Sequence, residues 1–197
     1  MASVASALAV LGSANMVAAA RAAQPHIFMV VVDDFGWADA GWHRGDGGGL
    51  PVTKEVVTPT MDALVKEGIE LNRHYVHMMC TPTRSSFQSG RLPIHVLTQL
   101  SSPCDHNGAI PRNMTGIAAQ LKKQGYSTHQ VGKWDCGMVT PHHTPHGRGY
   151  DTSLNYFDHG NWMWTEAAWG GSYNHRGDIP LPEETIIDFW DTDKPAH

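Results

Sequence analysis

The stretch HIFMVVVDDFGW, residues 26–37, gives the strongest strand signal in this chain of 197 residues. It is an apolar run, rich in β-branched residues, that ends abruptly in two acids. Such a run is typical of a buried strand in a parallel sheet. It predicts a strand over residues 27–32, with Asp33 and Asp34 at the carboxyl end.

The segments that follow alternate between helix and strand. TPTMDALVKEG predicts a helix, because Thr58 can cap it, Pro59 suits its first position and Gly68 can end it. The remaining predictions are a strand over residues 69–76, a helix from Pro82 toward Gly90, a helix within residues 114–125, a strand over 126–134, and long surface loops after Pro141. This order predicts an α/β fold with a mostly parallel sheet flanked by helices. Ligands in such sheets bind at the carboxyl ends of strands, where Asp33, Asp34 and Lys133 fall.

The composition is that of a globular protein with one sizeable core, since 41% of the residues are hydrophobic. The formal net charge is −5, and lysine and arginine form no run or patch in the sequence. Nucleic acid is therefore not an expected partner.

The first 24 residues are small and mostly apolar, with no acid among them. We interpret residues 1–23 as a signal peptide cleaved near Ala20 to Ala23, although the usual basic start is missing. A buried or disordered helix is the alternative, and the apolar part is too short to span a membrane. Export would make Asn113, in the triplet NMT, an acceptor for N-glycosylation. Of the three cysteines, Cys104 and Cys136 remain available for a disulfide if Cys80 serves other chemistry.

Two constellations could carry chemistry. Adjacent Asp33 and Asp34 can both reach one hard cation such as calcium or magnesium if the backbone turns there; a solvated pair of loop acids is the commoner case. The sequence contains no GxxxxGK[ST] loop, which argues against nucleotide hydrolysis. Cys80 lies just before Pro82, near a helix N-terminus, with Arg84 one turn on. Thiol and guanidinium could face one anionic group, whereas a structural cysteine beside a surface arginine is the alternative.

These motifs together resemble those of the sulfatase family. Cys80-Thr81-Pro82-Thr83-Arg84 matches its C-x-P-[ST]-R motif, and Gly90-Arg91 matches the end of the longer form. Residues 125–134 resemble the second motif, and VVVDDFGW resembles the first metal strand. Two connecting segments, TPTMDALVKEG and HGRGYDT, are in the family's order. The resemblance covers roughly residues 26–152 and is greatest to the arylsulfatase B type.

The resemblance implies an alkaline-phosphatase-like sulfatase fold and a particular reaction. In sulfatases the motif cysteine is oxidised to formylglycine by a generating enzyme in the secretory pathway. One hydroxyl of the hydrated aldehyde attacks sulfur and the alcohol leaves. The second hydroxyl then expels sulfate and restores the aldehyde. By this resemblance Asp33, Asp34 and converted Cys80 bind one calcium ion, Arg84 holds the diol, and Lys133 contacts the sulfate.

The resemblance also implies a sulfated small molecule or glycan as substrate. It implies an extracellular or lysosome-like location. Two alternatives remain open: a phosphate or phosphonate ester hydrolase of the same superfamily, and a non-enzymatic remnant.

The match to the family breaks at two points. The second motif normally ends Gly-Lys-Trp-His, with the histidine bonding the formylglycine hydroxyl, but this chain has Asp135 there. A carboxylate beside an anionic substrate should weaken turnover, so Asp135→His is predicted to raise it. The family also uses a later Asp, Asn, His and Lys, so residues 24–197 resemble an incomplete N-terminal part of the catalytic domain. We interpret His142, His143 and His146 as a solvated loop rather than a zinc site, and Trp162, Trp164 and Trp169 as packing residues rather than a sugar-stacking rim.

Overall fold

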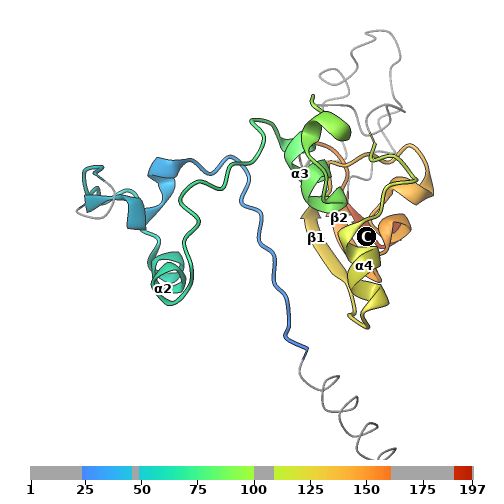
Figure 1. Ribbon diagram of the computed structural model, residues 1–197, viewed down its shortest axis with the longest axis horizontal. Coiled ribbons are helices and arrows are strands. Elements are labelled where there is room, and N and C mark those ends of the chain that lie inside the picture. The colour runs from blue at the N-terminus through green and yellow to red at the C-terminus, as the bar shows by residue number, and fades with distance from the viewer. Residues whose placement is uncertain (1–23, 46–48, 100–108, 161–188, 197) are drawn as a thin grey trace, which may run out of the picture. The chain divides into compact units, whose positions relative to one another are not determined.

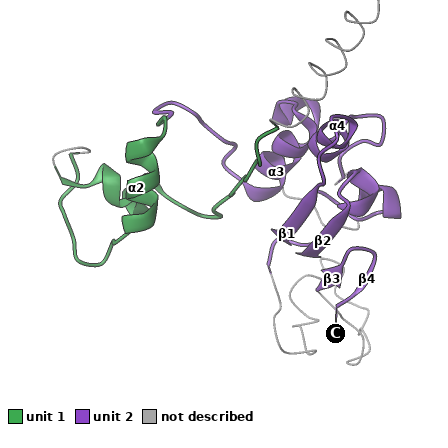
Figure 2. Cartoon of the chain, turned by 90° about the horizontal axis from the view of Figure 1, so that it is seen from below, with its two compact units in different colours: residues 1–70 green, residues 71–197 purple. Residues whose placement is uncertain are grey.

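The computed structural model describes residues 24–45, 49–99, 109–160 and 189–196 (Figure 1). The chain divides into two compact units, residues 1–70 and 71–197, shown in different colours in Figure 2. The predicted signal peptide and Cys104 lie outside the described residues, as do Trp162, Trp164 and Trp169.

The predicted strand over residues 27–32 is wrong. The segment is not assigned as a strand, and its side chains face solvent, with Phe28 91% and Val30 78% exposed. Among the described residues it forms no backbone ladder with another segment. An apolar, β-branched sequence favours a strand only when a neighbour supplies the main-chain hydrogen bonds, and that requirement is not met here.

The helix predicted from Pro59 is confirmed as α2, Pro59–Glu67, and it is preceded by two short 3-10 helices, η1 (Trp37–Asp39) and η2 (Gly41–His43). Pro59 is at the start of α2, where its missing N–H costs no helical hydrogen bond. The Thr58 hydroxyl accepts a hydrogen bond from the Gly41 N–H at 2.8 Å and donates one to Asp62 at 2.7 Å. Thr58 therefore ties η2 to α2 instead of capping the helix with its side chain.

The second unit contains two α-helices, α3 (Cys80–Ser89) and α4 (Ile117–Lys123). The helix predicted from Pro82 begins two residues earlier, because a proline fits anywhere in the first turn. It ends at Gly90, whose φ of 67° is in the left-handed region. The strand predicted over residues 69–76 is wrong, since the chain turns there and the His74 N–H bonds to the Leu71 carbonyl.

The sheet of the second unit is mixed, in the order β1-β2-β3-β4. Its strands are β1 (His129–Lys133), β2 (Thr152–Tyr156), β3 (Trp190–Asp191) and β4 (Lys194–Pro195). β1 confirms the strand predicted in residues 126–134, and it pairs in parallel with β2, while the other two pairs are antiparallel. The prediction of loops after Pro141 missed β2. Both views show α3 and α4 on one side of the β1–β2 pair (Figures 1 and 2).

The core of this unit packs around Trp134, which is 1% exposed and meets Tyr150 edge-on at 6.2 Å between ring centroids. Its indole N–H donates to the Gly137 and His143 carbonyls. The loop between β1 and β2 contains the 3-10 helices η5 (Pro141–His143) and η6 (His146–Arg148). The remaining buried members of the cluster are Ile110, Ala118, Cys136 and Phe157.

Gly149 allows α4 to approach the loop before β2. Its φ is 107°, and a Cβ there would lie 2.7 Å from the Ala119 nitrogen. A side chain would therefore meet both backbone strain and a steric clash. None of the helices that the structure describes has the length and apolar character needed to cross a bilayer.

Candidate active site

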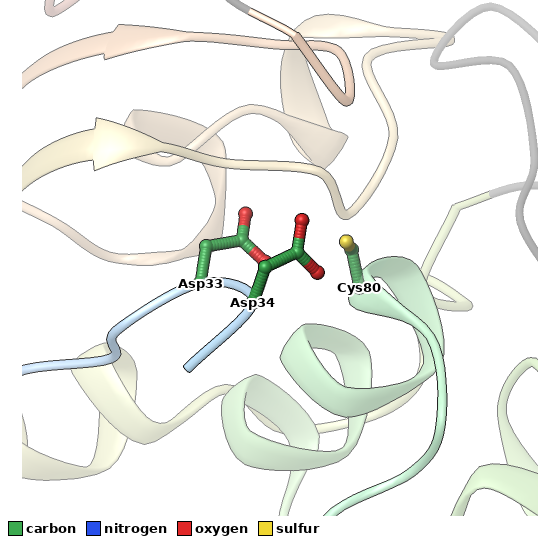
Figure 3. Close-up of side chains that lie close together, drawn as sticks. All are labelled: Asp33, Asp34 and Cys80. Carbon is green, nitrogen blue, oxygen red and sulfur yellow. The ribbon is translucent and has the colours of Figure 1, made fainter. Parts of the chain in front are cut away.

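Asp33 and Asp34 are on a turn at the end of the extended segment 27–32, where both are exposed. Asp34 has a φ of 53°, in the left-handed region that Asp tolerates better than most residues. The backbone therefore turns where the sequence required it to turn for two adjacent carboxylates to serve one cation. Figure 3 shows the two carboxylate groups projecting from this turn.

Cys80 is the first residue of α3, as Figure 3 also shows, and it is half-buried. The next residues of the motif anchor it, since Thr81 is 1% exposed and Pro82 is fully buried. At this position the side chain is beside the unpaired N–H groups and positive end of the helix. The predicted location of Cys80 at a helix N-terminus is confirmed.

Arg84 is on α3, one turn after Cys80, and it is the link between this helix and the end of β1. Its Nη1 donates a hydrogen bond of 2.9 Å to the Lys133 carbonyl oxygen. This contact brings the two motifs together, although 49 residues separate them in sequence. Cys80, Arg84 and Lys133 are therefore held by neighbouring elements of one unit.

Lys133 ends β1 and is paired with Asp135. Its Nζ lies 3.5 Å from Asp135 Oδ2, and the two side chains are only 5% and 3% exposed. Asp135 Oδ1 also accepts a hydrogen bond of 2.7 Å from the buried Thr81 hydroxyl. The aspartate that replaces the motif histidine is thus in contact with the Cys80 motif through Thr81 and with Lys133 directly.

His159 lies beyond the end of β2 and was not predicted from the sequence as a site residue. Its Nδ1 is 2.9 Å from Asp135 Oδ1, and its Nε2 is 3.6 Å from Asp158 Oδ1. The Asp135 carboxylate raises the pKa of His159, against a smaller lowering by burial. The alternating pattern of TSLNYF could have identified β2 and so placed His159 at a strand end.

The sequence also singled out Cys136, Asn113 and three loop histidines, and the structure shows the surroundings of each. Cys136 is a free, buried cysteine, so the disulfide considered for it in the sequence is not formed, and burial raises the pKa of its thiol. Asn113 is exposed in a turn, as a glycosylation acceptor must be. Burial lowers the pKa of His143. In the part of the chain that the structure describes, His142, His143 and His146 do not form a group able to hold a metal ion.

The fold and these motifs are those expected of the sulfatase family, and comparison with known families agrees. The Sulfatase family model matches residues 25–179. The chain belongs to the sulfatase family.

Similar proteins include mouse (Mus musculus) arylsulfatase J, 38% identical over 135 residues, which are 68% of this chain and 21% of that protein. Human (Homo sapiens) steryl-sulfatase is 33% identical over 124 residues, 59% of this chain and 20% of that protein. The chain spans about a fifth of the length of these relatives.

Solved structures give the same assignment. The crystal structure of Ps i-CgsB matches with a TM-score of 0.67 and 28% identity, covering 88% of this chain and 37% of that one. The PsFucS1 sulfatase from Pseudoalteromonas sp. matches with a TM-score of 0.54 and 27% identity, covering 72% and 27%. The predicted fold class, part of an α/β alkaline-phosphatase-like sulfatase fold, is confirmed.

Proposed function

We propose that the protein is a sulfuric ester hydrolase of the arylsulfatase type that cleaves a sulfate monoester with Cys80, converted to formylglycine, as its nucleophile. The observation that carries this proposal is the arrangement around the start of α3. Cys80 begins the helix, Arg84 follows one turn on, and Arg84 bonds to the end of the strand that carries Lys133. Together with the complete C-x-P-[ST]-R motif, this arrangement supports a nucleophile at position 80 that acts on an anionic ester.

Formylglycine formed at Cys80 would, once hydrated to its gem-diol, supply one hydroxyl as nucleophile and a second for releasing the sulfate. Groups of the chain itself would stabilise and orient this nucleophile. The helix N-terminus stabilises negative charge at position 80. The Arg84 fork holds the diol, and its bond to the Lys133 carbonyl fixes its direction.

Lys133 is suited to contact the sulfate, because its ammonium group is at a strand end and is held by Asp135. A positioned cation favours the charge that develops on the transferring group more strongly in a site with little water. The burial of the Lys133 side chain, 5% exposed, provides those surroundings. We assign Cys80, Arg84 and Lys133 as the catalytic residues.

The residues present suit calcium as the metal. Asp33 and Asp34 offer adjacent carboxylates on a turn, and hard oxygen ligands are those that calcium prefers. Asp33, Asp34 and an oxygen of the converted Cys80 would hold the ion, which would polarise the sulfate and favour the ionised diol. These ligands are fewer than the ~6–8 oxygens that calcium takes, so further ligands must come from elsewhere.

The proposal includes a route of maturation. Conversion of Cys80 by a formylglycine-generating enzyme implies passage through the secretory pathway, with residues 1–23 as the signal peptide and residues 24–197 as the N-terminal part of the catalytic domain. Asn113 would then be available for glycosylation. The product would act in an extracellular or lysosome-like compartment on a sulfated small molecule or glycan.

The test compares turnover of an aryl sulfate and the matching aryl phosphate by the complete gene product, secreted from a eukaryotic host. We expect turnover of the sulfate, its loss in Cys80→Ala, and its loss with a calcium chelator followed by recovery with added calcium. Asp34→Asn should increase the calcium concentration needed for half-maximal activity. The control Cys136→Ala changes the buried cysteine outside the motif and should remain active if it folds.

Preference for the phosphate would overturn the proposal in favour of the related ester hydrolases. Equal background rates for the wild type and Cys80→Ala, in folded protein, would identify a non-enzymatic remnant.

A further inference from the structure

The aspartate at the position of the motif histidine adds a negative charge next to the lysine proposed to contact the sulfate. Asp135 is 2% exposed and is beside Lys133, the residue proposed to contact the sulfate. The carboxylate would cancel the lysine charge and leave the pair neutral toward an anion. A buried carboxylate near an anionic substrate is also costly unless cations and hydrogen bonds balance it.

We propose that His159 is a positioning residue of this site, and that the Asp135–His159 pair takes the place of the histidine missing from the second motif. This inference rests on the proposed sulfatase function. The pair would restore the positive charge that Asp135 removes and keep Lys133 directed at the sulfate.

The backbone explains why these two residues meet. Beyond the β1–β2 ladder, the Trp134 N–H bonds to the Tyr156 carbonyl at 2.9 Å and the Asp135 N–H to the Phe157 carbonyl at 3.2 Å. The two chain segments therefore stay paired beyond the ends of β1 and β2, and this pairing brings Asp135 and His159 close together. Their side chains approach to 2.9 Å between His159 Nδ1 and Asp135 Oδ1.

The backbone at position 135 also explains why this exchange is tolerated. Asp135 has a φ of 49°, in the left-handed region. Asp, Asn and His are the side chains enriched there apart from glycine. The family histidine and the aspartate of this chain can thus occupy the same turn without moving it.

The charges around the imidazole favour its protonated form. Asp135 from the end of β1 and Asp158 from its own segment attract the proton, while Lys133 of β1 opposes it. From α3 the uncharged Thr81 donates to Asp135, and the Arg84 guanidinium donates to the Lys133 carbonyl. With His159 protonated, the three buried or half-buried groups Lys133, Asp135 and His159 have a net charge of +1, the charge of the lysine alone. Asp158 is farther from His159, at 3.6 Å, and is 23% exposed, so water screens its charge more than that of Asp135.

The pairing changes the expectation for Asp135→His. In isolation that substitution should raise turnover, because it restores the family motif. With His159 in place, it removes the carboxylate that contacts both Lys133 and the His159 imidazole, and it brings a second imidazole against them. We therefore expect Asp135→His alone to lower activity, and Asp135→His combined with His159→Gln to recover part of the loss.

The experiment measures kcat and KM for an aryl sulfate against pH, in the complete gene product, for the wild type, His159→Gln, His159→Arg, the two Asp135→His variants, and His142→Gln. His142 is an exposed histidine in the same unit and serves as the matched control. We expect His159→Gln to lower kcat/KM about tenfold, mainly through KM, because the lost interaction is with an anion. His159→Arg keeps the charge and should recover part of that loss.

The pH profile separates a charge role from a structural one. In the wild type KM should rise as pH increases through the pKa of His159, since deprotonation removes the restoring charge. That rise should be absent in His159→Gln and unchanged in His142→Gln. NMR titration of His159 gives a second readout: it should titrate at higher pH than an unperturbed histidine, about 6.5, and Asp135→Asn should lower its pKa.

The outcomes distinguish this inference from the proposed function. If the wild type turns over no aryl sulfate, the proposed function fails and this inference with it. If the wild type is active while His159→Gln keeps its KM and its pH profile, only this inference is overturned. An ordinary titration of His159 that Asp135→Asn does not move would also overturn it, independently of activity.

Discussion

Two segments of the chain have the sequence of a strand followed by charged residues, but only one of them forms a strand. Residues 27–32 are the more apolar and more β-branched, and they are exposed and form no ladder among the described residues. β1 contains a histidine, a glutamine and a glycine, and it pairs along its whole length with β2. The comparison shows that a ladder partner decides whether a strand forms, and that local propensity comes second.

The largest effect should come from truncating an aromatic side chain in residues 27–32 and one directly after β1. Trp134→Ala should lower the free energy of unfolding by about 3–5 kcal/mol, because it empties a core site. Phe28→Ala should change it by less than about 0.5 kcal/mol, since Phe28 is 91% exposed. Urea denaturation of the chain measures both. Similar losses for the two variants would show that residues 27–32 are packed in solution and would break the comparison.

A second, smaller effect should appear where backbone and packing coincide. Gly149→Ala should lower the free energy of unfolding by about 2–3 kcal/mol, because residue 149 has a left-handed backbone and its new Cβ would clash with Ala119. Gly90→Ala is the matched control, since Gly90 has a φ of 67° but no atom within 4 Å of the new Cβ. Gly90→Ala should lower the free energy of unfolding by only about 1 kcal/mol. Equal losses in denaturation would mean that α4 does not pack closely against the loop before β2.

How far the sequence predicted the fold depends on whether the signal was local. α2 and β1 were predicted because Pro59 at a helix start and the run ending in Lys133 are local features. The strand over residues 27–32 failed because pairing is not local. β2 was missed because TSLNYF lies between stretches rich in His, Trp and Gly that suggested loops.

The candidate site divides in the same way. Cys80, Arg84 and Lys133 are in motifs that can be read from the sequence. His159 and its pairing with Asp135 depend on two strand ends meeting, which no spacing in the sequence reveals.

The polar contacts at the end of β1 should contribute less than its core. Thr81→Val keeps the shape of the side chain but removes the hydrogen bond to Asp135, so it should lower the free energy of unfolding by about 1–2 kcal/mol. Thr83→Val removes a hydroxyl that donates to the backbone carbonyls of His77 and Met79, and it should lower the free energy of unfolding by less. A Thr81→Val protein as stable as the wild type would show that Asp135 is satisfied without Thr81. Denaturation midpoints provide the measurement.

The smallest effect should be a change in acid sensitivity at the edge of the second unit. Lys122 and then the Thr128 backbone N–H lower the pKa of Asp151 to about 2. The unfolded carboxyl titrates near ~3.9, so the ionised form stabilises the fold above that pH, and this contribution is lost as pH falls toward about 2. Asp151→Asn should therefore make the urea midpoint less dependent on pH across this window. An unchanged dependence would contradict the pairing with Lys122.

The most direct test of the central claim is the mass of the tryptic peptide HYVHMMCTPTR, residues 74–84, from protein secreted by a eukaryotic host. The peptide WDCGMVTPHHTPHGR, residues 134–148, contains Cys136 and serves as the control within the same digest. The account predicts an aldehyde or its hydrate at Cys80 and no such change at Cys136. A thiol at Cys80, when the same cells convert a known sulfatase, would contradict the formylglycine mechanism.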